Sequence, residues 1–136
     1  MCANYNWRNQ TILITEDDPL NYRYLELILT KKTSVNLIWA KNGTDSIHIA
    51  KQNENIDLIL LDLHLPDIDG IEVLKEVKKF KPSLPVFIQT ANTWNDEDKI
   101  CMQEGADHFF TKPINMDKLL LSIDNTIKEQ MFTTSE

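Results

Sequence analysis

The 136-residue sequence predicts an α/β fold, in which one domain is built on a doubly wound, five-stranded parallel sheet. Five short apolar runs alternate with segments that carry helix signals, and this alternation is typical of a parallel sheet with helices on both faces. The first, third and fourth runs contain continuous rather than alternating apolar stretches (ILI, LILL and VFI), as in strands buried on both sides. The length and the 42% share of hydrophobic residues suit one domain with one core.

The five apolar runs are the predicted strands. They are Thr11–Thr15, Val35–Ala40, Asp57–Leu61, Val86–Thr90 and Asp107–Thr111. In folds of this class, ligands bind at the carboxyl ends of the strands. The residues that follow each run are therefore the first candidates for a functional site.

The first predicted helix begins directly after the first strand. Asp18 can act as its N-cap, and Pro19 suits the first helical position because a backbone N–H there has no helical partner. The face of this helix that we expect to be buried carries Leu20, Tyr24, Leu27 and Ile28.

Polar caps also mark the later helices. Asn42, Asp69 and Asn115 can cap the second, third and fifth helices by accepting backbone hydrogen bonds. The fourth helix has weaker signals, with acidic residues at 96–98 in its first turn and Gly105 as its expected end. The chain is thus predicted to repeat strand and helix five times.

The domain is predicted to span residues 11–130. We assign residues 1–10 to an N-terminal tail or linker and residues 131–136 to a C-terminal tail. Tyr5 and Trp7 belong either to a linker or to a segment that packs on the sheet edge. The polar N-terminus lacks the apolar core of a secretion signal, and no apolar run approaches the ~20 residues that span a membrane.

Charge and cysteine content narrow the class of protein. The formal net charge of −7 argues against nucleic-acid binding, which requires a basic surface. Cys2 and Cys101 are expected to be reduced thiols, because Cys2 lies in the predicted tail. We expect a cytoplasmic protein with no direct membrane contact.

Acidic residues follow two of the predicted strands, and other polar groups follow two more. Residues 16–18 (EDD) follow the first strand, Asp62 follows the third, Thr90 ends the fourth, and Lys112 follows the fifth. Two carboxylates ~5 Å apart repel each other by roughly 3 kcal/mol at an effective dielectric of ~20, so such a cluster needs a proton or a cation. Oxygen ligands at a partly open site suit Mg²⁺ (or Mn²⁺).

The same rim of the sheet can hold a phosphoryl group. Lys112 supplies a positive charge and Thr90 a hydrogen-bond donor for phosphoryl oxygens. A carboxylate would be the nucleophile, which gives an aspartyl phosphate. Each residue alone has a purely structural explanation, as a cap, a turn or the end of a strand. Their convergence at one rim is what indicates a site.

Four stretches carry a family resemblance: ILITEDDP, DLILLDLHLPDIDG, PVFIQTAN and FFTKPI. In order and spacing they resemble the response regulator receiver family of two-component signal transduction, from about residue 10 to 130. The resemblance implies a (βα)5, flavodoxin-like domain with strand order 2-1-3-4-5. It also implies Mg²⁺-dependent transfer of a phosphoryl group from a phosphohistidine to Asp62, followed by a conformational switch.

The resemblance assigns a role to each matching residue of the metal site. Asp62 matches the phospho-acceptor and a metal ligand, and Asp17 matches the direct carboxylate ligand. Glu16 matches an acid that acts on the metal indirectly. The backbone carbonyl of His64 matches the group that completes the metal shell.

Further residues match the switch of the family. Thr90 is the switch hydroxyl, Lys112 the phosphate-contacting lysine and Phe109 the switch aromatic. The peptide bond before Pro113 is expected to be cis. The side chains of His64 and Asn92 are expected to tune the rate of dephosphorylation.

We expect Trp94, four residues after Thr90, to report the switch by a change in fluorescence. Trp7 and Trp39 are expected to lie far from the pocket. The implied partner is a histidine kinase or a histidine phosphotransfer domain, and a homodimer could form through the face of the fourth helix, fifth strand and fifth helix.

Several alternatives stay open. A phosphatase of the haloacid dehalogenase type needs a second acid two residues after its nucleophile, where this chain has His64. A flavin-binding protein needs a Ser/Thr/Gly-rich phosphate loop where this chain has acids, and a non-phosphorylated scaffold would show no Mg²⁺ affinity. The receiver would be either a stand-alone regulator or the receiver end of a hybrid sensor histidine kinase. The receiver itself is not expected to be a classical enzyme, since it would catalyse only its own phosphorylation and dephosphorylation. Histidine kinase activity is expected only if the chain is part of a larger hybrid protein.

Overall fold

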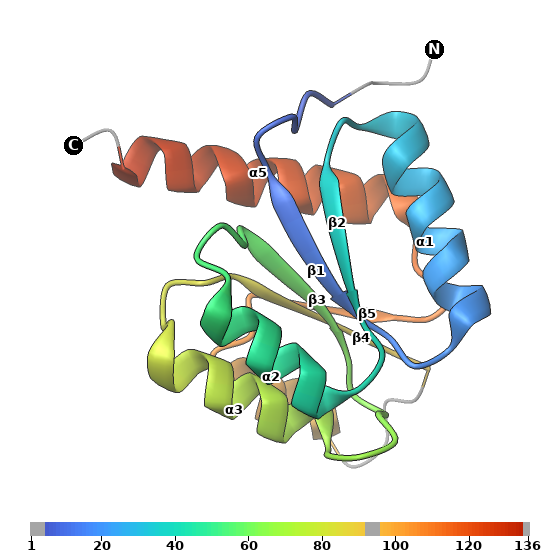
Figure 1. The fold of residues 1–136 in the computed structure, drawn as a ribbon, viewed down its shortest axis with the longest axis vertical. Helices are drawn as coiled ribbons and strands as arrows, with labels where there is room; N and C mark the ends of the chain where they lie inside the picture. Colours follow the sequence, from blue (N-terminus) through green and yellow to red (C-terminus); the bar gives the residue numbers. More distant parts are fainter. Residues whose placement is uncertain (1–4, 92–95, 135–136) are drawn as a thin grey trace.

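A five-stranded parallel sheet forms the centre of the molecule (Figure 1). The structure, a computed structural model, describes residues 5–91 and 96–134. The strands are β1 (Thr11–Thr15), β2 (Asn36–Ala40), β3 (Leu58–Asp62), β4 (Val86–Thr90) and β5 (His108–Thr111). Their order, β2-β1-β3-β4-β5, confirms the predicted doubly wound, flavodoxin-like fold. Only the ends of β2, β3 and β5 differ from the prediction, each by one residue.

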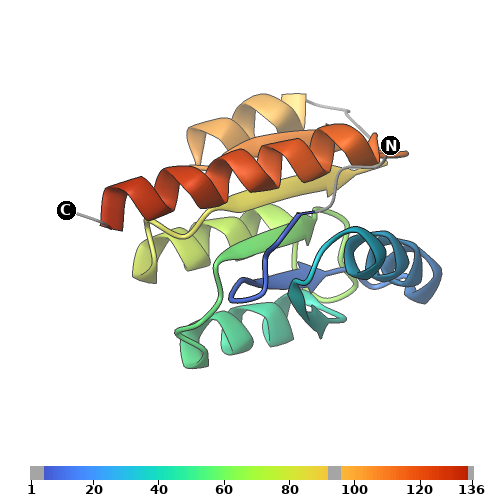
Figure 2. The ribbon, with the colours of Figure 1, turned by 90° about the horizontal axis from the view of Figure 1, so that it is seen from above.

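Helices cover both faces of this sheet (Figures 1 and 2). They are α1 (Pro19–Lys32), α2 (Gly43–Gln52), α3 (Gly70–Phe80), α4 (Glu97–Gln103) and α5 (Met116–Thr134). Apolar side chains of α1 and α5 pack against one face, and those of α2, α3 and α4 pack against the other. The strands are therefore buried on both sides, which explains why β1, β3 and β4 are apolar at successive positions.

The predicted N-caps are confirmed. The side chains of Asp18, Asn42 and Asp69 accept hydrogen bonds of 2.7–3.0 Å from backbone N–H groups in the first turns of α1, α2 and α3. Asn115 accepts one of 3.2 Å at the start of α5. The helix α4 has no such side-chain cap, and it ends shortly before Gly105, whose φ of 105° favours glycine.

The predicted buried face of α1 is wrong. Tyr22, Leu25 and Leu29 face the core. By contrast, Leu20 is 81% exposed, and Tyr24 and Leu27 are also largely exposed. Apolar residues surround much of this helix, so the spacing of hydrophobic residues allows two faces. The packing of α1 against the sheet selects the Tyr22 face.

Part of the predicted N-terminal tail packs on the domain. Trp7 is 2% exposed and lies in the core between the sheet, α1 and α5. Its indole N–H donates a 3.0 Å hydrogen bond to Asp124 of α5, and Tyr5 forms an isolated bridge with Thr33. Of the two interpretations of Tyr5 and Trp7, the structure favours a segment that packs on the sheet over a linker. The helix α5 continues to Thr134, past the predicted end of the domain at residue 130.

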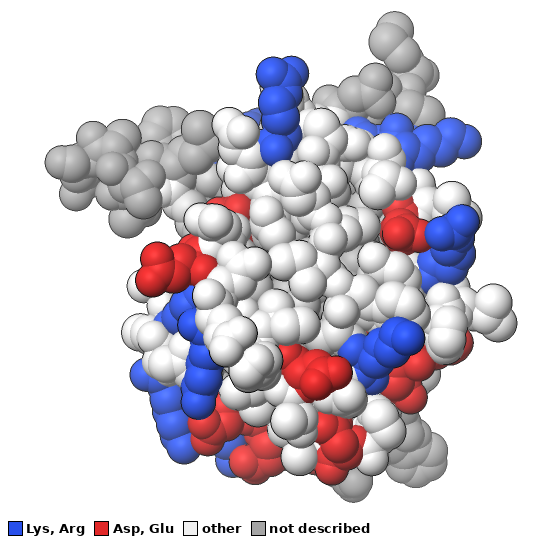
Figure 3. Space-filling view, viewed as in Figure 1, with Lys and Arg blue, Asp and Glu red and all other residues white. Residues whose placement is uncertain are grey.

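The charged side chains are unevenly distributed. On the face drawn in Figure 3, most Asp and Glu side chains lie in the lower half, with several Lys or Arg side chains among them. Among the described residues, no helix combines the length and the apolar character that crossing a membrane requires.

Candidate functional site

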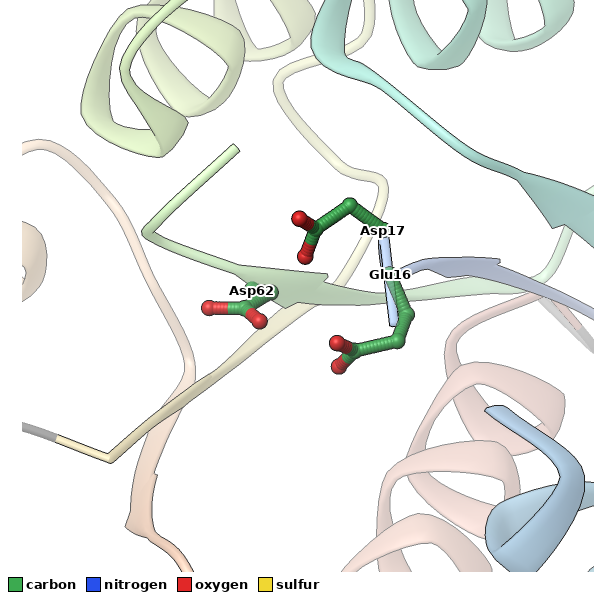
Figure 4. A group of neighbouring side chains, drawn as sticks. All are labelled: Glu16, Asp17 and Asp62. Atoms are coloured by element: carbon green, nitrogen blue, oxygen red, sulfur yellow. The ribbon is translucent and has the colours of Figure 1, made fainter. Parts of the chain in front are cut away.

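Three carboxyl groups meet at the carboxyl edge of the sheet (Figure 4). Because β1 and β3 are neighbours, the turn after β1 brings Glu16 and Asp17 next to Asp62 at the end of β3. One oxygen atom of each of the three carboxyl groups lies within 4.8 Å of the others. Glu16 and Asp62 are buried, whereas Asp17 is exposed. The structure therefore brings together the three acids that the sequence placed at this rim.

Lys112 contacts two of these acids. Its Nζ lies 2.9 Å from Asp62 Oδ2 and 3.2 Å from Glu16 Oε2. Burial by itself would lower the pKa of Lys112, but its contacts with the Asp62 and Glu16 carboxylates raise the pKa overall. The ammonium group thus stays charged at neutral pH. The following bond, Lys112–Pro113, is cis as expected.

Two further residues hold Glu16. Its Oε2 accepts hydrogen bonds from Asn21 Nδ2 at 2.7 Å and from Gln89 Nε2 at 3.2 Å, in addition to the contact with Lys112. Burial and then the charge of Asp62 raise the pKa of Glu16, while the contacts with Asn21 and Lys112 oppose that shift. Sequence reasoning missed Asn21 and Gln89. The available signal for Gln89 was its amide side chain, which directly follows the apolar stretch VFI within β4.

The loop after β3 is tied to its surroundings. The backbone N–H of His64 donates a 3.0 Å hydrogen bond to Asp62 Oδ1. Asp67 accepts 2.8 Å hydrogen bonds from the N–H groups of Gly43 and Thr44, at the start of α2. The His64 side chain is 54% exposed, and its Nε2 lies 3.9 Å from Glu97 Oε1 of α4. The loop is thus held close to the Asp62 carboxylate.

The two residues of the predicted switch lie on neighbouring strands. Thr90 is buried at the end of β4, opposite Thr111 of β5. Phe109 pairs with Ile88 and is half-buried against the core on the α2–α4 side of the sheet. The predicted tuning residue Asn92 and the predicted reporter Trp94 lie outside the described residues.

The predicted position of Trp39 is wrong. Its indole nitrogen lies 2.8 Å from the backbone oxygen of Glu16, directly beside the acidic turn. The error arose because β2 is an edge strand, and only the direction of the side chain brings its ring to the end of β1. Trp7 lies at the opposite edge of the sheet, before the start of β1.

The donor set of the pocket fits a hard divalent cation. Three carboxylates face one ammonium group, which leaves two negative charges for a cation to neutralise when all three acids are ionised. Carboxylate oxygens are the ligands that Mg²⁺ prefers. Asp17 and Asp62 could hold such an ion directly, with Glu16 close by.

The fold and the pocket together define a class: a flavodoxin-like α/β domain with an acidic pocket at the carboxyl edge of its sheet. The family model of the response regulator receiver domain matches residues 12–124. The chain therefore belongs to the receiver domain family of two-component response regulators, as the sequence motifs indicated.

Two curated relatives match most of this chain over only part of their own length. The chain is 36% identical over 122 residues to a cyclic di-GMP phosphodiesterase of Thermotoga maritima, with 90% of this chain and 32% of the relative covered. It is 30% identical over 125 residues to the transcriptional regulatory protein GlrR of Escherichia coli, with 92% and 28% covered. The chain thus spans about a third of the length of these relatives.

Solved structures show the same fold. A CheY-like receiver domain protein of Methanospirillum hungatei superposes with a TM-score of 0.84 at 27% identity, covering 91% of this chain and 98% of the other. The receiver domain of the sensor histidine kinase PA1611 of Pseudomonas aeruginosa superposes with a TM-score of 0.79 at 25% identity, covering 88% and 98%. That structure has a magnesium ion coordinated in its active site cleft.

Proposed function

We propose that this chain accepts a phosphoryl group on Asp62 in a Mg²⁺-dependent reaction and switches its surface in response. The observation that carries the proposal is the convergence of three carboxylates with Lys112, which lies 2.9 Å from Asp62. Asp17 and Asp62 are the proposed carboxylate ligands, and the backbone carbonyl of His64 is proposed to complete the shell. Glu16 acts through its charge or a bridging water, since its Oε2 already accepts three hydrogen bonds.

The donor is proposed to be a phosphohistidine on a histidine kinase or a histidine phosphotransfer domain. A carboxylate oxygen of Asp62 attacks the phosphorus and forms a P–O bond. The P–N bond breaks, and its electron pair stays on the imidazole nitrogen. Lys112 and the hydroxyl of Thr90 stabilise the phosphoryl oxygens as charge develops on them. A bound Mg²⁺ would neutralise further negative charge on the phosphoryl group.

Phosphorylation is proposed to act through Thr90 and Phe109. The hydroxyl of Thr90 turns toward the phosphoryl oxygens, and Phe109 moves further into the space behind β4. Phe109 is already half-buried and has no hydroxyl to satisfy, so its inward position costs little desolvation. A partner, or a second copy of the chain, would bind to the changed surface of α4, β5 and α5. The chain is then a regulatory module, either alone or as the receiver end of a hybrid sensor histidine kinase.

Phosphorylation by acetyl phosphate tests the central claim. With Mg²⁺ present, the protein should gain the mass of one phosphoryl group, and peptide mapping should place it on Asp62. The gain should vanish in Asp62→Asn and when the metal is chelated. Asp57→Asn is the matched control, because Asp57 precedes the same strand at its opposite edge and should leave the gain unchanged.

The same experiment separates this proposal from a scaffold role. A non-phosphorylated scaffold would bind no Mg²⁺ and gain no mass. Labelling that persists in Asp62→Asn would place the acceptor elsewhere and refute the assignment.

A further inference from the structure

Trp39 contacts the main chain of the acidic turn. Its indole N–H donates a 2.8 Å hydrogen bond to the backbone carbonyl of Glu16, the residue directly before Asp17. The backbone N–H of Glu16 donates in turn to the carbonyl of Ala40 at 3.0 Å. Both polar groups of the Glu16 backbone are therefore bonded to residues of β2, one to its main chain and one to a side chain.

The geometry of the strand pair explains this contact. The pairing of β1 with β2 ends at Thr15 and Ala40, and the chain then bends at residues 41 and 42 into α2. Because the chain bends away from β1 there, the Glu16 carbonyl meets the indole of Trp39 instead of the main chain of β2. A buried carbonyl without such a donor would be costly.

The same ring also contacts the far side of the acidic turn. Tyr22, in the first turns of α1, stacks on Trp39 with ring centroids 4.1 Å apart and planes inclined by 3°. The Nζ of Lys41 lies 4.8 Å from the centroid of the Trp39 ring. Trp39 thus joins the residue before Asp17 to the helix that begins after it.

We propose that Trp39 is a positioning residue for the metal site, a role that rests on the proposed function. Its hydrogen bond fixes the peptide plane between Glu16 and Asp17. The orientation of that plane sets the direction in which the Asp17 carboxylate leaves the main chain toward Asp62. Trp39 touches neither the metal nor the phosphoryl group and acts through the Glu16 carbonyl.

Mg²⁺ affinity tests this role. Trp39→Phe keeps an aromatic ring against Tyr22 but removes the N–H donor. Isothermal titration should show Mg²⁺ binding about tenfold weaker than in the wild type, the low end of what outer-shell contacts contribute. Trp7→Phe is the matched control. It also removes an indole hydrogen bond, the one to Asp124, but at the amino edge of the sheet, far from the acidic turn. It should lower stability and leave the Mg²⁺ affinity unchanged.

A second measurement keeps Trp39 in place. In a chain that carries Trp7→Phe and Trp94→Phe, Trp39 is the one remaining tryptophan. Its emission should change on adding Mg²⁺, and the change should disappear when Asp17→Asn is added. This measurement holds even if Trp39→Phe lowers the yield of folded protein.

The outcomes are distinguishable. If the wild type binds Mg²⁺ but Trp39→Phe binds it equally well, or if Trp39 emission stays constant at saturating Mg²⁺, the positioning role is overturned and the phospho-acceptor proposal stands. If the wild type binds no Mg²⁺ and gains no phosphoryl group, both proposals fail.

Discussion

Two adjacent acids of the pocket differ sharply in their surroundings. Asp17 is exposed, whereas Glu16 is fully buried and its Oε2 accepts hydrogen bonds from three side chains. An acid with open lone pairs can bind a cation directly, while an acid already engaged by donors contributes mainly its charge. Two adjacent acidic residues thus acquire different roles from their environment.

This difference predicts the effects of two neutral substitutions. Asp17→Asn should weaken Mg²⁺ binding more than Glu16→Gln, because the first removes the proposed direct ligand and the second removes a charge that is proposed not to contact the metal. Isothermal titration of both variants at the same ionic strength measures the order. The reverse order would show that Glu16 is the direct ligand.

A carboxylate far from the pocket, Asp124 of α5, is expected to make stability depend on pH. Burial alone would raise the pKa of Asp124, but hydrogen bonds from Trp7 and Lys128, and the charge of Lys128, lower it below its ordinary 3.8. The folded state therefore binds this proton less readily than the unfolded state. The resulting stability is present above about pH 4 and is lost as the pH falls through the folded-state pKa.

Asp124→Asn tests this linkage. Near neutral pH the substitution should lower the free energy of unfolding by about 1 kcal/mol, because Lys128 loses its partner and Trp7 keeps only a neutral acceptor. The difference from the wild type should shrink as the pH falls below about 4 and through the lowered folded-state pKa of Asp124. Urea unfolding at several pH values measures it, and a difference independent of pH would contradict the assignment.

At the scale of elements, two helices begin at glycines that lie very close to neighbouring segments of the chain. A Cβ on Gly70, at the start of α3, would lie 2.5 Å from Leu63 Cα and 2.7 Å from the Asp62 carbonyl oxygen. A Cβ on Gly43, at the start of α2, would meet only side-chain atoms of Ile68 and Val73. Backbone atoms at the end of β3 cannot move aside as easily as side chains.

The two glycines should therefore respond differently to alanine. Gly70→Ala should lower the free energy of unfolding by about 3 kcal/mol, and Gly43→Ala by about 1 kcal/mol, within the range of overpacking substitutions. Chemical denaturation of the two variants provides the comparison. Equal losses would mean that the contact of α3 with the end of β3 does not determine the cost of the added methyl group.

At the scale of the whole molecule, the proposed switch connects the carboxyl edge of the sheet, where Asp62 lies, to the side of the domain formed by α4, β5 and α5. Thr90 and Phe109 lie on β4 and β5, whereas Ser34 and Asn36 lie at or just before the start of β2, the edge strand farthest from β5. A rearrangement that begins at Asp62 should therefore remain on the α4–β5–α5 side. Its extent can be mapped residue by residue.

Beryllofluoride, which imitates a phosphoryl group, should reveal the switch in the presence of Mg²⁺. Backbone amide NMR signals should shift in Glu97–Gln103 and His108–Thr111, while Ser34 and Asn36, at or just before the start of β2, serve as unshifted internal controls. Thr90→Ala should reduce the shifts in β5 while beryllofluoride still binds at Asp62. Shifts in β5 that are unchanged in Thr90→Ala would show that the signal does not pass through the Thr90 hydroxyl.

The sequence by itself determined the architecture and the main acids of the pocket. Continuous apolar runs alternating with capped helices leave little choice except a parallel sheet covered on both faces. In such a sheet the carboxyl ends of the strands share one edge, so Asp17, Asp62 and Lys112 could be grouped without coordinates. These features depend on local pattern and on topology, which the order of residues carries directly.

Only the tertiary structure decided which side chains meet across that framework. The buried face of α1, the burial of Trp7, and the contacts of Gln89 and Trp39 with Glu16 were missed or left open from the sequence. Each depends on how a side chain is directed once two distant segments have packed together. Apolar residues around much of α1, and a tryptophan on an edge strand, permit more than one arrangement. The packing of the complete core selects one of them.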